Sequence, residues 1–73
     1  MIHIHDFVAI LDDVPNSNIT KGTTGTIVSQ LSDDYFLVEF SNEYGEVFEQ
    51  IPFQQDSLLV LHRISENVEL ANP

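Results

Sequence analysis

Short runs of β-branched and aromatic residues recur along this chain of 73 residues, and they constrain the fold more than any other feature of the sequence. Each run is closed by turn-forming residues such as Gly, Pro, Asn, Asp and Ser, and no window shows the period of an amphipathic helix. Runs of this kind are typical of strands in a small all-β domain. The expected strands cover residues 7–11, 25–31, 35–40, 46–51 and 58–61.

The segments between these runs favour a particular all-β architecture. A long polar loop is expected over residues 16–24, and one tight helical turn over residues 53–57. Five short strands with a 3-10 turn before the last one predict a small SH3-like barrel, with a barrel of the oligonucleotide-binding type as the alternative. The barrel domain is expected to cover residues 1–64, and residues 65–73 are expected to form a flexible polar C-terminal tail.

Side-chain alternation along the third expected strand predicts the core. Phe36, Val38 and Phe40 share one face of that strand. The opposite face carries a carboxylate, so we expect the aromatic face to point inward. The expected companions of these residues come from the other four strands: Val8, Ile10, Ile27, Ile51, Leu59 and Leu61.

The chain is strongly acidic, with 12 Asp and Glu residues against two Lys and Arg residues and a formal net charge of −10 at pH 7. Binding to a phosphate backbone depends on Lys and Arg side chains that release counterions, so nucleic acid is an unfavourable partner. The charge instead favours a basic protein partner. The alternative is a solvated acidic surface that only keeps the protein soluble.

The third and fourth expected strands form a hairpin that concentrates this charge, although its register stays open. With a three-residue loop, residues 43–45, and a bulge at Gly45, Phe40 would face Phe48, and Glu39 would face Glu49 across the two strands. A four-residue loop would instead place Phe40 opposite Val47. The candidate partner-binding residues belong to this hairpin and its tip: Glu39, Glu43, Tyr44, Glu46 and Glu49.

Three glycines are expected to have structural roles in turns. The segment 21–28 reads KGTTGTIV, so Gly22 and Gly25 stand at the entry to the second expected strand. One glycine of such a loop allows a positive φ and the other permits close approach of two backbones, while Gly45 is expected to close the acidic hairpin. The segment resembles the KOW-type signature of SH3-like barrels in ribosomal proteins and transcription elongation factors. That resemblance implies nucleic-acid association as an alternative function, which the shortage of basic residues disfavours.

A wider pattern covers residues 6–61. It combines the glycine segment with DFVAILDDVP at 6–15, a Tyr-x-x-Val-Glu-Phe motif at 35–40, IP at 51–52 and DSL at 56–58. With this pattern the chain resembles a family of short acidic bacterial proteins of unknown function. Some members accompany genes for presumed toxins, so the resemblance implies an antitoxin-like, immunity-like or accessory role. No catalytic residue belongs to the pattern.

Groups that support catalysis or metal binding are few and isolated. His3 and His5 would share a face of an extended N-terminus, but a structural zinc site needs four ligands and only Asp6 is close. The chain has no cysteine, and no nucleophile pattern accompanies His62. We therefore expect no enzymatic activity, no cofactor and no bound metal. No apolar run approaches the roughly 20 residues that span a bilayer, and the N-terminus lacks a basic leader, so we expect a cytoplasmic protein without membrane association.

Overall fold

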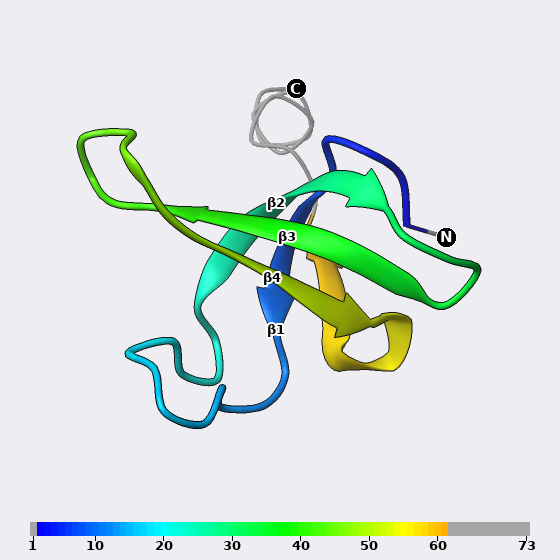
Figure 1. Ribbon diagram of the computed structural model, residues 1–73, viewed down its shortest axis with the longest axis horizontal. Coiled ribbons are helices and arrows are strands. Elements are labelled where there is room, and N and C mark those ends of the chain that lie inside the picture. Colours follow the sequence, from blue (N-terminus) through cyan, green and yellow to red (C-terminus); the bar gives the residue numbers. More distant parts are fainter. Residues whose placement is uncertain (1, 62–73) are drawn as a thin grey trace, which may run out of the picture.

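The computed structural model describes residues 2–61, which form one antiparallel sheet of five strands in the order β4-β3-β2-β1-β5 (Figure 1). A 3-10 helix, η1 (Gln55–Ser57), joins the last two strands. The all-β class and the turn before the last strand are thus confirmed. The strands are β1 (Phe7–Ile10), β2 (Thr24–Gln30), β3 (Tyr35–Ser41), β4 (Val47–Gln54) and β5 (Leu58–Leu61).

The sheet is not closed into a barrel, so the predicted closure is wrong. β4 and β5 are the two edge strands, and no ladder of hydrogen bonds joins them within residues 2–61. Although η1 brings the chain from one edge to the other, β5 pairs over its whole length with β1, from Phe7–Leu61 to Ile10–Leu58. The side of β5 that faces away from β1 remains unpaired in this part of the chain. At the other edge of the sheet, the proline in β4 removes one N–H donor.

The fourth strand was predicted to stop at residue 51, but Pro52 does not end it. β4 continues to Gln54, and Pro52 pairs with Leu37 of β3. A proline is compatible with a strand at the edge of a sheet, because the outward-facing side needs no N–H donor. The sequence alone did not reveal that this strand lies at an edge.

The core lies on one face of the sheet and is built around β3. Phe36, Val38 and Phe40 are all buried, which confirms the predicted inner face of this strand. The rings of Phe40 and Phe53 meet edge to face, with centroids 6.0 Å apart. The other buried hydrophobic residues are Ile2, Val8, Ile10, Ile19, Ile27 and Leu58, and Val14, Ile51 and Phe53 pack against them.

The predicted contribution of β5 to the core is wrong by one position. Leu59 is 52% exposed, and Leu61 is only half-buried, whereas Leu58 is buried. The register explains the difference, because Leu58 pairs with the buried Ile10 and Leu59 pairs with Ala9. Leu59 and Leu61 therefore point to the outer face of the sheet. A strand of four apolar residues has no polar side chain to mark that face in the sequence.

Two of the predictions fall on residues that are not described. The predicted C-terminal tail, residues 65–73, and His62 lie outside the described part of the chain. Between residues 2 and 61 there is no helix with the length and apolar character that crossing a bilayer requires.

Candidate functional site

The hairpin of β3 and β4 projects from the rest of the sheet and carries the candidate residues (Figure 1). Its strands are joined by residues 42–46, and the Asn42 N–H donates a hydrogen bond of 2.9 Å to the Glu46 carbonyl. Gly45 has φ 81°, and its N–H donates to the Asn42 carbonyl at 3.0 Å. The positive φ is the role expected for Gly45, since glycine adopts this conformation without a Cβ clash.

The side chain of Asn42 fixes the shape of this loop. Its Oδ1 accepts hydrogen bonds from the N–H of Tyr44 at 2.9 Å and from the N–H of Glu46 at 3.0 Å. Its Nδ2 donates to Oε1 of Glu46 at 3.0 Å. An asparagine that bonds neighbouring backbone groups in this way stabilises a turn. The Glu46 carboxylate is therefore held by the loop itself.

We predict that Asn42→Ala destabilises the protein by about 1–2 kcal/mol, because two backbone N–H groups lose their side-chain acceptor. Amide hydrogen exchange should accelerate at Tyr44 and Glu46 while the core amides stay protected. Glu46→Gln is the matched control, since its amide oxygen still accepts from Asn42 Nδ2. Equal exchange in Asn42→Ala and the wild type would show that the Asn42 side chain does not hold the loop.

Next to the loop the register of the hairpin matches the three-residue alternative, because the Asn42 N–H donates to the Glu46 carbonyl and Ser41 pairs with Val47, but farther along the strands it differs from both alternatives. Phe40 pairs with Glu49, and Glu39 pairs with Gln50. The register then shifts, so that Ser41 pairs with Val47 and Phe48 is left as the extra residue of a bulge. The three-residue alternative therefore predicted the loop but not the bulge at Phe48, which moves the partners of Phe40 and Glu39 by one position along β4. The four-residue alternative, with Phe40 opposite Val47, was wrong.

This register separates two of the predicted glutamates. Glu39 follows the outer face of β3, whereas Glu49 lies opposite the buried Phe40 on the other face. Glu39 is half-buried, and its Oε2 accepts a hydrogen bond of 3.0 Å from Nε2 of Gln50. Glu39 thus lies opposite the amide of Gln50 and not opposite Glu49, the partner that the three-residue alternative predicted.

The tip of the hairpin exposes the predicted Tyr44 and also two apolar side chains that were not predicted, Val47 and Phe48. Tyr44 is 81% exposed, Phe48 is 54% exposed and Val47 is 50% exposed. One of the two predicted registers placed Phe48 opposite Phe40, and the bulge removes it from that position. Glu43 lies in the loop and Glu49 lies in β4, and neither carboxylate makes a hydrogen bond within the described residues. We define the tip patch as these five residues: Glu43, Tyr44, Val47, Phe48 and Glu49.

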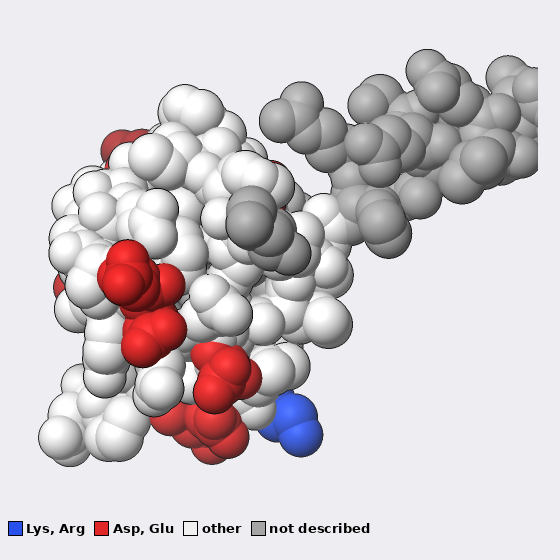
Figure 2. Space-filling model, turned by 90° about the vertical axis from the view of Figure 1, so that its right-hand side faces the viewer, with Lys and Arg blue, Asp and Glu red and all other residues white. Residues whose placement is uncertain are grey.

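The acidic charge is not confined to the hairpin. Figure 2 views the opposite end of the molecule, where acidic side chains also gather on the surface. Lys21 is the only Lys or Arg residue in the described part of the chain. Electrostatic attraction of a basic partner is therefore a property of much of the surface, whereas the exposed aromatic groups are what distinguish the tip patch.

The glycine segment has a structural place in the sheet. Gly22 has φ 91°, and its N–H donates to the Ile10 carbonyl at 2.9 Å. Gly25 lies against β3, where an added Cβ would be 2.6 Å from Cγ1 of Val38. One glycine thus provides a positive φ and the other a close approach, which is sufficient to explain the spacing without a bound ligand.

The N-terminal histidines do not form a metal site within the described residues. Nδ1 of His3 lies 3.8 Å from Oδ2 of Asp6, and His5 is exposed. Between residues 2 and 61 no group of three or more His, Asp or Glu side chains is placed to hold a metal ion.

The fold and the tip patch define the chain as a small all-β domain with a projecting hairpin that is both acidic and aromatic. Residues 4–60 match the family model described as a domain of unknown function, DUF4926. The chain belongs to this family, which confirms the predicted membership of a family of unknown function in that general sense. A search of curated proteins and a search of solved structures gave no match.

Proposed function

We propose that the protein is a non-enzymatic interaction module and that its tip patch binds a basic protein partner. The observation that carries the proposal is the exposure of Tyr44 and Phe48, each next in the sequence to an exposed glutamate, Glu43 and Glu49 respectively. Protein interfaces combine buried aromatic anchors with a polar rim. In this arrangement the rings would anchor the partner, while the carboxylates attract and orient its Lys and Arg side chains.

The biological setting is part of the same proposal. An antitoxin-like, immunity-like or accessory role in the cytoplasm is compatible with a small acidic domain of an otherwise unassigned family. The lack of cysteine is compatible with a reducing compartment. We also propose that the domain is related to SH3-like barrels, with the closing edge left open. Support comes from the five short antiparallel strands and the 3-10 turn before the last of them.

The experiment uses the intact protein as bait and compares two variants that carry the same charge change. The Glu43→Gln/Glu49→Gln variant changes the tip patch, and Asp12→Asn/Asp34→Asn removes two exposed carboxylates from other loops. Captured proteins are identified by mass spectrometry, and the affinity of the purified partner is then measured. We expect the tip variant to bind at least about tenfold more weakly and the loop variant to bind normally.

Salt and aromatic substitutions separate this proposal from its alternatives. Wild-type affinity should fall as ionic strength rises, and Tyr44→Ala should weaken binding at every salt concentration. An equal loss in the loop variant would mean that only bulk charge matters. Retention of nucleic acid in place of protein, abolished by nuclease, would support the KOW-like alternative instead.

A further inference from the structure

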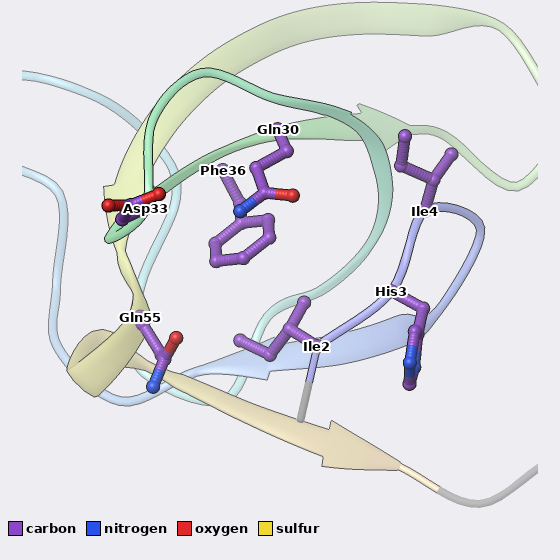
Figure 3. A pocket seen from close by; sticks show the side chains of 7 residues that line it. All are labelled: Ile2, His3, Ile4, Gln30, Asp33, Phe36 and Gln55. Carbon is purple, nitrogen blue, oxygen red and sulfur yellow. The ribbon is translucent and has the colours of Figure 1, made fainter.

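A cavity of about 470 Å³ lies at the end of β3 that is far from the tip patch (Figure 3). Its volume falls in the range of roughly 300–1,000 Å³ that small ligands occupy. Its walls come from residues 2–4, the end of β2, the turn between β2 and β3, and η1. Phe36 belongs to the core and forms the apolar base of the cavity. Segments far apart in the sequence thus meet around one opening.

The N-terminal wall of this cavity is held in a defined conformation. The His5 N–H donates to the Ile27 carbonyl at 2.7 Å, and the His3 N–H donates to Oδ2 of Asp6 at 2.8 Å. His5 has φ 76°, a left-handed conformation that is unfavourable for a residue other than glycine. The turn buries Ile2 beside the cavity.

The polar groups that line the cavity are the Asp33 carboxylate, the side-chain amides of Gln30 and Gln55, and the His3 imidazole. Nε2 of Gln30 donates to the Ser32 carbonyl at 3.1 Å, which leaves Oε1 as the atom that a ligand can reach. Figure 3 shows Gln30 above the opening, with Asp33 and Gln55 on the side opposite His3. Within residues 2–61 the Asp33 carboxylate makes no hydrogen bond, and among these residues no Lys or Arg side chain lines the cavity.

We propose that this cavity binds an alkylguanidinium group, the chemistry of an arginine side chain. A guanidinium carries five N–H donors and no acceptor, so it complements the Asp33 carboxylate and the amide oxygens of Gln30 and Gln55. The methylene stem of the ligand contacts Ile2 and Phe36, as the stem of arginine often does on an apolar surface. An anion is disfavoured by Asp33 and by the formal net charge of −10.

An ammonium group would also be attracted by the Asp33 carboxylate, but its geometry fits the polar groups of the cavity less well than that of a guanidinium. It is a compact point charge with three donors, whereas the planar guanidinium places its donors in a fork that reaches several oxygens at once. The proposal does not rest on the tip patch, because the cavity and the patch share no residue.

The test is an NMR titration of the full chain with two probes. Nα-acetyl-L-arginine methylamide represents arginine within a protein, and agmatine represents a free alkylguanidinium. We expect saturable amide shifts confined to the residues around the cavity, with a Kd of about 1–10 mM for a group of this size. Nα-acetyl-citrulline methylamide has nearly the same shape without the charge and should bind at least about tenfold more weakly.

Two single substitutions provide a matched control for the charge. Asp33→Asn should weaken the arginine probe about tenfold, whereas Asp34→Asn removes the same charge one residue away and should have little effect. Binding of the acetylated probe alone assigns the cavity to arginine of a partner protein, and equal binding of agmatine assigns it to a free compound. Both results support the proposal.

Other outcomes would overturn it. Equal affinity for the citrulline probe, equal weakening by Asp34→Asn, or no shifts up to tens of millimolar would each show that the cavity does not recognise a guanidinium. The Glu43→Gln/Glu49→Gln variant should bind the probes normally. A failure of this proposal therefore leaves the proposed role of the tip patch untouched.

Discussion

Gly25→Ala should unfold the protein or lower its free energy of unfolding by about 3 kcal/mol or more. The added Cβ would lie 2.6 Å from Cγ1 of Val38 and 2.9 Å from the carbonyl oxygen of Glu39. Val38 is fully buried, and the carbonyl is part of the backbone of β3, so neither can move aside cheaply. β2 is also paired with β1 on its other side, through Val8 and Gly25. Urea denaturation followed by circular dichroism measures the loss.

Gly22→Ala and Gly45→Ala are the matched controls for this substitution. A Cβ at either position meets no heavy atom within 4 Å, but the φ values are 91° and 81°. The cost therefore comes from the left-handed backbone alone, at about 1–2 kcal/mol for each. A Gly25→Ala protein as stable as these two variants would refute the argument that close packing of β2 on β3 requires glycine.

The alternation of side chains was sufficient to predict the inner face of β3 because that strand carries Glu39 among apolar residues. The same rule failed in β5, where every side chain is apolar and the pairing of Leu58 with Ile10 decides the inner face. Ile19 is buried although it lies in a polar loop, since the Val14 N–H donates to the Ile19 carbonyl at 2.9 Å and turns the loop inward. Such a contact depends on tertiary structure and leaves no periodic signal.

Whether the sheet closes into a barrel could not be predicted from the sequence, for a related reason. Alternating strands have the same pattern in an open sheet and in a barrel, because the difference is only whether the two edge strands pair. Pro52 is compatible with either a strand end or an edge strand, and the predicted strand at residues 46–51 stopped before it, whereas β4 is an edge strand that continues through it.

The candidate site could be predicted only in part. The turn at Gly45 followed from its sequence, but the bulge at Phe48 did not, because no Gly or other turn-forming residue in β4 marks its position. The sequence pattern therefore did not predict that Phe48 is exposed. The cavity beside Phe36 was not predicted at all, since its lining comes from separate segments that form no motif.

Phe40→Ala is expected to lower the free energy of unfolding by about 3–5 kcal/mol, which approaches the whole stability that a core of this size provides. Phe40 is 1% exposed, and its ring meets Phe53 edge to face. Its neighbours Gly25 and Val38 lie in the hydrogen-bonded centre of the sheet, so they cannot collapse into the space that the ring leaves. Phe40→Leu retains most of the volume and should keep the transition measurable, with a loss of about 1–2 kcal/mol.

Phe48→Ala makes the same chemical change on the other strand of the hairpin and should cost less than about 1 kcal/mol, because Phe48 is 54% exposed. Its expected effect is on partner binding, which should weaken while the unfolding transition stays near that of the wild type. The two phenylalanines thus separate the stability of the hairpin from recognition by its tip. If Phe48→Ala destabilised the protein as strongly as Phe40→Ala, Phe48 would have to belong to the core, and the tip patch would lose one of its two aromatic anchors.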